Sequence, residues 1–336
     1  MKIIVTGGCG FIGSNFIHYL LNKYPSVKII NLDLLTYAGN LANLKDIDKN
    51  SRYKFIRGDI TDGKLVNRLI SKESPDAVVN FAAESHVDRS LYKPADFLRT
   101  NILGVQILLE AARQHNIKRF VQISTDEVYG SLGLKDPAFK ETNRLDPSSP
   151  YSVSKTAADL LVKSYEKTFG YKAIITRSSN NYGPYQFPEK VIPLFITNAI
   201  ADKSVPLYGD GLNIRDWLYV EDNCRAIDLV MRKGNLGEIY NIGGNSERSN
   251  LYITKTILKA LNKPDSLIKY VKDRPGHDLR YAIDISKIRR QLNWEPRYRF
   301  GDGIRKTVDW YLNNEKWWEQ IKTGEYLKFY RKHYQT

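Results

Sequence analysis

The first half of the chain alternates short apolar runs with segments of helical spacing. The runs are KIIVT, VKIINLD, YKFIRGD, DAVVNFAA, RFVQIS and YKAIITRSS, and the segments between them include GSNFIHYLLNKY and TNILGVQILLEAARQH. Strands that are apolar throughout need cover on both faces, which is typical of a parallel sheet with helices on each side. The handedness of β–α–β crossovers then predicts a doubly wound α/β fold.

The pattern changes after Ser179. The stretch NNYGPYQFPEK is rich in turn formers and aromatic residues, and mixed elements follow it, among them the helix-like VEDNCRAIDLVMRK. We therefore expect a sheet domain over residues 1–179 and a smaller mixed α/β domain mainly over 180–336, some of whose segments return to the sheet. Open α/β sheets bind ligands at the carboxyl edges of their strands, so we expect the second domain to hold a substrate there.

The composition fits a globular protein and argues against several kinds of partner. The chain has 336 residues, of which 42% are hydrophobic and 26% charged. Its net charge of +14 comes from Lys and Arg spread along the sequence, which favours a solvated basic surface over a nucleic-acid interface. No apolar stretch is long enough for a bilayer, no apolar leader precedes the first run, and Cys9 and Cys224 lack metal-ligand spacing. We expect a cytoplasmic protein with no metal, no membrane and no nucleic-acid partner.

A glycine-rich turn, TGGCGFIGSN, follows the first apolar run and opens a helical segment. Gly8, Gly10 and Gly13 satisfy the G-x-G-x-x-G pattern, in which the backbone approaches a pyrophosphate at a helix N-terminus. Asp33 follows twenty residues after Gly13, where a carboxylate binds the adenosine ribose and disfavours a 2′-phosphate. The pattern therefore predicts a Rossmann-type domain that binds NAD rather than NADP.

Tyr151 and Lys155 lie four residues apart in YSVSK, so a helix presents both on one face. A lysine ammonium and a nicotinamide cation both favour ionisation of a phenol, whose pKa is ordinarily ~10. The pair is therefore interpreted as a general base, beside the Thr125 hydroxyl that ends the preceding strand.

With NFAA at residues 80–83, these motifs make the chain similar to the extended short-chain dehydrogenase/reductase family over nearly its whole length. The resemblance implies catalysis by Thr125, Tyr151 and Lys155 with NAD as the cofactor. The expected cofactor contacts, which include the end of the third strand for the adenine, are Gly7, Gly10, Phe11, Ile12, Gly13, Asp33, Thr36, Asp59, Ile60, Phe81, Ala82, Ala83, Thr100, Tyr151 and Lys155.

Two neighbouring carboxylates, Asp126 and Glu127, follow Thr125 in STDEVYG. Ser124-x-x-Glu127 also fits a helix capping box, and this structural interpretation stays open beside a catalytic one. Together with AAESHVDRS, GDGLNIRDWLYVEDN and DRPGHDLRYAID, the pair makes the chain resemble the dTDP-glucose 4,6-dehydratases of that family. The resemblance implies that Glu127 removes a proton from C5 of the sugar while Asp126 protonates the hydroxyl leaving C6. Asp126 must then stay protonated near neutral pH, which a dry site beside a like charge favours.

The same resemblance assigns residues to the substrate, dTDP-glucose, and places the product in rhamnose or other deoxysugar synthesis. Arg215 and Arg274 are the candidates for the phosphates, because guanidinium groups match phosphate oxygens. His86 is interpreted as structural, since Tyr151 already supplies the base. The other expected substrate contacts are Ser85, Thr125, Asn180, Lys190, Asn250 and His277.

The helices that begin near Arg99 and Ser152 carry apolar residues on more than one face, which indicates burial within the subunit or against a partner. The resemblance implies a homodimer through these helices. Two other functions stay open. A UDP-sugar 4-epimerase or UDP-glucuronate decarboxylase on this fold would leave Asp126 without a role, and a non-catalytic NAD-binding regulator would leave all the acid–base residues without one.

Overall fold

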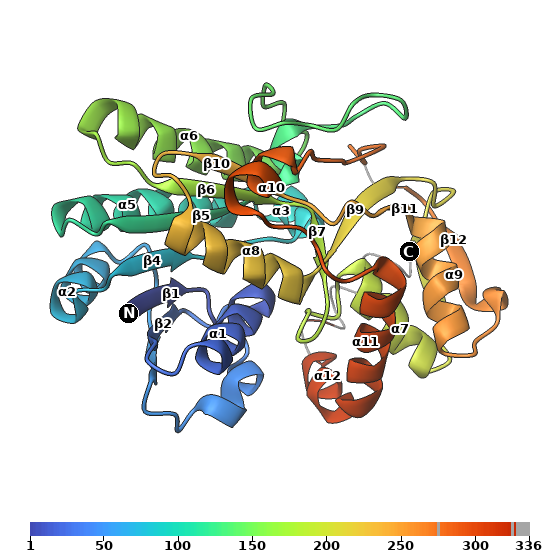
Figure 1. The fold of residues 1–336 in the computed structure, drawn as a ribbon. Helices are drawn as coiled ribbons and strands as arrows, with labels where there is room; N and C mark the ends of the chain where they lie inside the picture. The colour runs from blue at the N-terminus through green and yellow to red at the C-terminus, as the bar shows by residue number, and fades with distance from the viewer. Residues whose placement is uncertain (274–275, 324–325, 327–336) are drawn as a thin grey trace.

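The computed structural model describes residues 1–273, 276–323 and 326, and a parallel sheet lies at its centre (Figure 1). This sheet has seven strands in the order β10-β6-β5-β4-β1-β2-β3, and all neighbouring strands are parallel. The strands are β1 (Lys2–Thr6), β2 (Lys28–Asp33), β3 (Tyr53–Arg57), β4 (Ala77–Asn80), β5 (Arg119–Thr125), β6 (Ile174–Ser178) and β10 (Ile239–Ile242). The strand order reverses between β1 and β4, as in a doubly wound fold, so the predicted fold class is confirmed.

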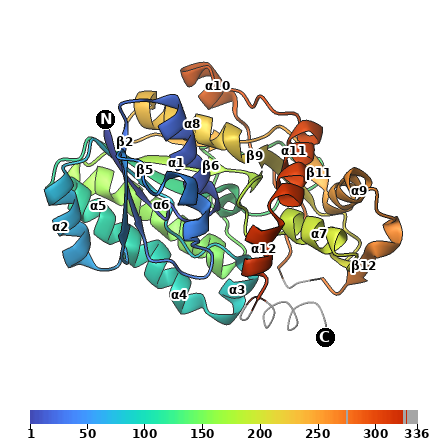
Figure 2. The same ribbon diagram turned by 90° about the horizontal axis from the view of Figure 1, so that it is seen from below.

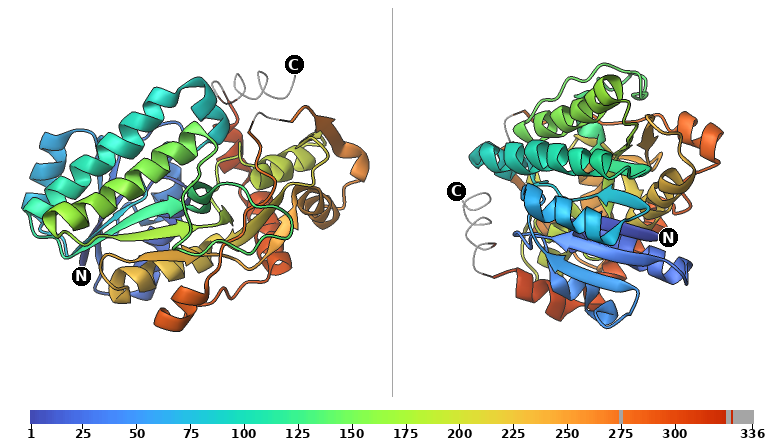
Figure 3. Two further views of the ribbon diagram at one scale, coloured as in Figure 1. Left: turned by 90° about the horizontal axis from the view of Figure 1, so that it is seen from above. Right: turned by 90° about the vertical axis from the view of Figure 1, so that its left-hand side faces the viewer.

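Helices cover both faces of the sheet, because its strands bury side chains on both sides (Figures 1 and 3). On β1, Ile3 and Val5 belong to one hydrophobic core and Ile4 to the other. The helices of the first core are α1 (Phe11–Lys23), α8 (Val220–Lys233) and α10 (Ser286–Leu292). Those of the second core are α2 (Gly63–Glu73), α5 (Val105–Gln114) and α6 (Pro150–Phe169).

A π-helical turn, η2 (Arg99–Gly104), interrupts the helix that leads into α5. It follows α3 (Val87–Tyr92) and α4 (Pro94–Leu98). The Asn101 side chain in this turn donates hydrogen bonds to Ser154 Oγ at 2.8 Å and to the Glu84 carbonyl at 3.0 Å. The turn therefore ties α6 to the loop that follows β4, at the edge where ligands of such sheets bind.

A second unit lies beyond the carboxyl ends of the strands (Figures 1 and 2). Its core combines aliphatic side chains with several aromatic ones, among them Tyr182, Trp217, Phe300, Tyr311 and Trp318. It contains a three-stranded sheet in the order β11-β9-β7 and a two-stranded sheet of β8 and β12. The strands are β7 (Asn180–Tyr182), β8 (Val205–Tyr208), β9 (Ile214–Tyr219), β11 (Glu247–Ser249) and β12 (Ile268–Val271), and the helices are α7 (Val191–Ile200), α9 (Asn250–Ala260), α11 (Phe300–Asn313) and α12 (Glu315–Ile321). Short 3-10 turns complete the chain at η1 (Leu41–Ile47), η3 (Asp126–Tyr129) and η4 (Asp265–Leu267).

The change of architecture falls between β6 and β7. After β7, the chain returns to the central sheet through α8, β10 and α10. On this basis we propose the division at residues 1–179 and mainly 180–336. Among the helices of the described part of the chain, none is both long and apolar enough to cross a membrane.

Candidate active site

The glycine-rich turn packs so closely against the end of β4 that side chains have no room. Gly7 has a φ of +68°, and a Cβ there would lie 2.5 Å from the backbone nitrogen of Ala82. A Cβ at Gly13 would lie 2.4 Å from the carbonyl oxygen of Gly7. Gly10 is the N-cap of α1, and since it has no side chain, the first amides of that helix receive no side-chain cap. The start of α1 is therefore a cradle open to a phosphate.

Asp33 ends β2 beside this turn. Its carboxylate accepts hydrogen bonds from the backbone amides of Cys9 and Leu35, both at 2.8 Å. Burial raises the pKa of Asp33, and these two amides act in the opposite direction. Asp33 thus fixes the glycine-rich turn to the sheet while its carboxylate borders the adjoining cavity.

This cavity, which we call the cofactor cavity, brings together every residue predicted to contact the cofactor. Its donor set fits NAD, since a side-chain-free turn suits the pyrophosphate and a carboxylate suits the ribose. Bound NAD supplies a hydride acceptor, and the chain supplies the binding surface and the proton-transfer groups. The predicted residues that line the cavity are Gly7, Gly10, Phe11, Ile12, Gly13, Asp33, Thr36, Asp59, Ile60, Phe81, Ala82, Ala83, Thr100, Tyr151 and Lys155.

The two carboxylates lie in η3, a single 3-10 turn that starts as β5 ends. We call Thr125, Asp126 and Glu127 the catalytic turn. The Thr125 hydroxyl accepts a hydrogen bond from the Glu127 amide at 3.3 Å and so caps the turn. Ser124 Oγ is buried without a hydrogen-bond partner among the described residues. The capping-box interpretation is therefore wrong for Ser124, although a local cap by Thr125 does exist.

Asp126 is a carboxyl group removed from water. Its side chain is 2% exposed, and its Oδ2 has no hydrogen-bond partner in the described part of the chain. Burial raises the pKa of Asp126 well above its usual value, and the charges of Glu127 and Asp216 add to the rise, while Arg215 opposes it. The direction matches the expectation from the sequence, because it favours the protonated form of Asp126.

Helix α6 places Tyr151 and Lys155 at the cofactor cavity. Ser149 caps the helix, because its hydroxyl accepts the Ser152 amide at 3.1 Å and Ser152 Oγ accepts the Ser149 amide at 2.9 Å. This capping box fixes the first turn, which carries Tyr151. One turn later, Lys155 Nζ donates to the carbonyl of Ile123 on β5 at 2.6 Å.

Burial shifts both side chains toward their neutral forms. It lowers the pKa of Lys155 to about 8, against the opposing charge of Asp159. The pKa of Tyr151 is raised by burial and by the charges of Glu127 and Asp126, while a hydrogen bond with Thr125 opposes the rise. In the chain alone, burial and the neighbouring carboxylates thus raise the pKa of Tyr151, and the predicted help from the nicotinamide cation stays a prediction.

A second cavity, which we call the substrate cavity, lies between the sheet and the second unit. Charged and amide side chains from distant segments meet there. Of the residues predicted to act on or bind the substrate, it is lined by Glu127, Asn180, Lys190, Arg215, Asn250 and His277.

Neighbouring groups hold these side chains in place. Arg215 Nη2 donates to the carbonyl of Asp278 at 2.9 Å, and its guanidinium lies 4.2 Å from the centre of the Tyr281 ring. His277 Nδ1 lies 2.6 Å from an Asp273 carboxylate oxygen. The cationic side of the cavity is thus fixed by the segment that precedes α10.

Three other predicted residues lie elsewhere. Ser85 lines the cofactor cavity. Thr125 and Asp126 line neither cavity, although both lie close enough to Tyr151 to shift its pKa. Arg274 lies outside the described residues.

The sequence interpretation missed Glu189, which lines both cavities together with Lys190. Arg89 Nε donates to Glu189 Oε2 at 3.0 Å, and the Arg89 guanidinium lies 4.0 Å from the centre of the Tyr37 ring. His86 accepts the Arg89 amide at 3.4 Å and caps α3, in line with its structural interpretation. The signal for Glu189 was its place in FPEK next to Lys190. Among the described residues, no cluster of three or more His, Cys, Asp or Glu side chains could hold a metal ion.

Comparisons with known proteins agree with this arrangement. The family model described as GDP-mannose 4,6 dehydratase matches residues 4–307. The chain is 51% identical to a dTDP-glucose 4,6-dehydratase of Escherichia coli, over 97% of this chain and 98% of that protein.

Solved structures give the same picture. The structure of a dTDP-glucose 4,6-dehydratase from Streptomyces venezuelae, with NAD and TDP bound, has a TM-score of 0.93 and 48% identity, and covers 96% of this chain and 100% of that one. A UDP-glucose 4-epimerase from Thermotoga maritima has a TM-score of 0.87 and only 30% identity, covering 94% of this chain and 100% of the epimerase. The fold is thus shared with epimerases, whereas the sequence is much more similar to the dehydratases.

Proposed function

The chain belongs to the nucleotide-sugar 4,6-dehydratase family, and we propose that it converts dTDP-glucose to dTDP-4-keto-6-deoxyglucose with NAD as a recycled cofactor. One observation carries this proposal. A buried carboxyl with a raised pKa, Asp126, lies beside a carboxylate that faces the substrate cavity, Glu127. Both act on the pKa of Tyr151 at the end of the cofactor cavity. An acid, a base and a phenol in such proximity match an oxidation followed by an elimination.

The first step oxidises C4 of the glucose. Tyr151 removes the proton from O4 while the C4 hydride passes to NAD, which leaves a 4-ketone. Only the phenolate of Tyr151 can take this proton, so Tyr151 must first lose its own proton to water. The Lys155 ammonium, which is present below a pH of about 8, favours that loss. The new ketone makes the proton on C5 acidic.

The second step eliminates water across C5 and C6. Glu127 takes the C5 proton, the electron pair forms the C5–C6 double bond, and Asp126 gives a proton to the C6 hydroxyl as it leaves. The hydride then returns to C6 and a proton returns to C5, so substrate and product differ by one water molecule. The elimination requires one carboxyl that gives a proton and one that takes a proton. Asp126 is buried, whereas Glu127 lines the substrate cavity, and such different surroundings suit the two roles.

The substrate cavity supplies the contacts for the nucleotide. Arg215 and Lys190 carry positive charge, and Asn180, Asn250 and His277 supply polar groups around it. We assign the pyrophosphate to Arg215, because its guanidinium is already oriented by the carbonyl of Asp278.

A turnover assay with dTDP-glucose and UDP-glucose side by side tests the proposal. We expect a 4-keto-6-deoxy product, which absorbs in alkali, with preference for the dTDP sugar. Interconversion of UDP-sugars without that absorbance would instead support an epimerase. No turnover of either sugar, with NAD bound, would support a regulator.

We also infer a homodimer formed through α6 and the helix that contains η2, which lie side by side (Figure 3). These helices expose Leu98, Leu103, Val153 and Leu160, whose exposed fractions run from 45% to 57%. We expect Leu160→Glu to convert dimers to monomers in light scattering. Leu236→Glu, at another exposed apolar position, is the control. A wild-type monomer would overturn this inference.

We infer a cytoplasmic enzyme that supplies rhamnose or another deoxysugar pathway. Cys9 and Cys224, both buried and unpaired, fit a reducing compartment.

A further inference from the structure

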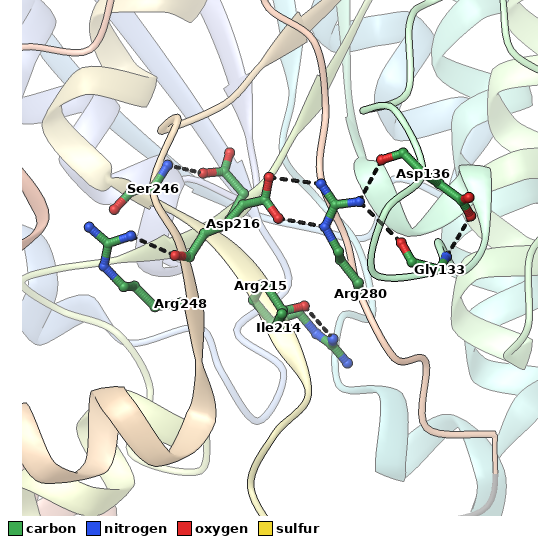
Figure 4. Close-up of polar contacts among 9 residues, drawn as sticks. Gly133, Asp136, Ile214, Arg215, Asp216, Ser246, Arg248 and Arg280 are labelled. Carbon is green, nitrogen blue, oxygen red and sulfur yellow. Dashed lines mark hydrogen bonds and ion pairs between the residues drawn. The ribbon is translucent and has the colours of Figure 1, made fainter.

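Arg280 lies at a junction of three chain segments (Figure 4). Its Nε and Nη2 donate to the two carboxylate oxygens of Glu247 at 2.6 and 2.9 Å. Its Nη1 donates to the carbonyls of Gly133 at 3.2 Å and Asp136 at 2.8 Å. The side chain is 10% exposed and lines neither the cofactor cavity nor the substrate cavity. Arg280 therefore uses four of its five N–H donors in contacts outside the lining of both cavities.

The first segment held by Arg280 is the loop that follows the catalytic turn. The Leu132 amide donates to the Arg280 carbonyl at 3.0 Å, and the Leu279 amide donates to Ser131 Oγ at the same distance. Further along, the Phe139 amide donates to the Ala282 carbonyl at 2.9 Å. This loop starts directly after η3, which carries Asp126 and Glu127.

The second segment is β11, through Glu247. Strand β11 pairs with β9 so that Glu247 lies opposite Asp216 and Arg248 lies opposite Arg215. Three residues after Glu247, Asn250 starts α9 and lines the substrate cavity. Through Glu247, Arg280 is therefore linked to two predicted substrate contacts. One is Arg215 on the paired strand β9, and the other is Asn250, which follows β11 in the chain.

The third segment is residues 276–285, which contain Arg280 itself. Ile214 and this segment exchange two hydrogen bonds, from the Ile214 amide to the Leu279 carbonyl at 2.8 Å and from the Tyr281 amide to the Ile214 carbonyl at 3.1 Å. His277 and Tyr281, at either side of Arg280, both line the substrate cavity.

We infer that Arg280 is a positioning residue that couples binding of the nucleotide to alignment of the catalytic turn. This inference rests on the proposed function for its kinetic consequences. Arg280 donates four hydrogen bonds, two of them side by side to one carboxylate, whereas a lysine ammonium has three donors at a single point and cannot reproduce this set. Movement of Arg215 or His277 toward a nucleotide is transmitted through Arg280 to the loop after η3.

The test compares Arg280→Lys and Glu247→Gln with wild type. The control is Arg248→Gln, since Arg248 lies next to Glu247 on β11 and donates to its carbonyl at 2.6 Å but does not reach the loop. We expect the kcat for dTDP-glucose to fall roughly 10-fold to 100-fold in Arg280→Lys and less in Glu247→Gln. The affinity for dTDP alone should change less than about threefold, because Arg280 lines neither cavity. The control should stay within about twofold in both measurements.

Hydrogen–deuterium exchange gives a readout that needs no turnover. Adding dTDP to the wild-type holoenzyme should slow amide exchange in the peptide spanning residues 124–133, and this protection should disappear in Arg280→Lys. Equal protection in both proteins, or a kcat within twofold of wild type, would overturn the inference. An equal loss of dTDP affinity and kcat would assign Arg280 a merely structural role and overturn it too. An inactive wild type that keeps the protection would refute the proposed function and leave the coupling supported.

Discussion

The cofactor cavity and the substrate cavity are built in different ways. The cofactor cavity is formed largely by turns that follow successive strands of one sheet, and the glycine-rich turn in its lining leaves no room for side chains. The substrate cavity collects single side chains from segments between residues 86 and 281, and other side chains hold them in place. The first site depends on chain geometry over short stretches, whereas the second depends on tertiary contacts. A single substitution in the cofactor cavity should therefore cause a large loss of cofactor binding, whereas one in the substrate cavity should cause a small loss of substrate binding.

The largest effect is expected at the glycine-rich turn. Gly13→Val places a side chain where the Gly7 carbonyl oxygen already lies, 2.4 Å from the Cβ position. We expect a loss of bound NAD of more than a hundredfold, measured as cofactor content after purification and by calorimetric titration. Gly301→Ala is the control, since no heavy atom lies within 4 Å of its Cβ position. Normal NAD content in Gly13→Val would contradict a backbone-built site.

The next effect tests the acid in the catalytic turn. Asp126→Asn removes a proton donor but keeps the shape of the side chain. We expect overall turnover to fall by roughly a hundredfold or more, the usual worth of a general acid. Oxidation of C4 should largely persist, so reduced cofactor should accumulate in a stopped-flow experiment at 340 nm. Equal loss of both steps would show that Asp126 does not serve the elimination alone.

A stability measurement sharpens the comparison at Lys155. In the unfolded chain its pKa is ~10.4, and in the folded chain it is about 8 because of burial. At pH 7 the ammonium is charged in both states, so its burial destabilises the fold. We expect Lys155→Met to raise the free energy of unfolding of the cofactor-free protein by about 3 kcal/mol while abolishing turnover.

The pH dependence of that gain follows from the sign of the shift. Between pH 8 and ~10.4 the folded wild type releases this proton before the unfolded chain does, so its stability rises with pH. The gain from Lys155→Met should therefore shrink across this window in urea unfolding experiments. A gain that is equal at pH 7 and pH 10 would show that the buried charge is not its cause.

The smallest effect is expected in the substrate cavity. Asn250→Ala removes one polar side chain from a surface that several residues share. We expect KM for dTDP-glucose to rise roughly tenfold or less with little change in kcat, as for the loss of a single hydrogen bond. The NAD content should stay at the wild-type level. A collapse of kcat would mean that the substrate cavity is as intolerant as the glycine-rich turn.

The same contrast explains how far the sequence could be interpreted. The parallel sheet, the glycine-rich turn and the pair of Tyr151 and Lys155 follow from local patterns, because strand ends and helix turns place nearby residues predictably. Asn180, Arg215 and Asn250 were assigned by family resemblance, since no spacing reveals that they meet. Arg280 had no sequence signal at all. Its hydrogen-bond partners lie 33, 144 and 147 residues away.

The pKa shifts of the site were a second feature that could be predicted only in part. The raised pKa of Asp126 could be anticipated, because a like charge follows it directly in the sequence. The raised pKa of Tyr151 could not be anticipated, since it is caused by burial and by the carboxylates that follow β5, a different element from the helix that carries Tyr151. A proton-transfer assignment from spacing therefore names the groups more reliably than their charge states.

Glu189 and Lys190 form a wall that belongs to both cavities. Because the two cavities share these residues, binding in one cavity is coupled to binding in the other. If bound nucleotide sugar changes the affinity for the dinucleotide by some factor, then bound dinucleotide changes the affinity for the sugar by the same factor. An enzyme that must finish with the cofactor it started with would gain from a favourable coupling of this kind, because the sugar would then strengthen the binding of the dinucleotide during the reaction.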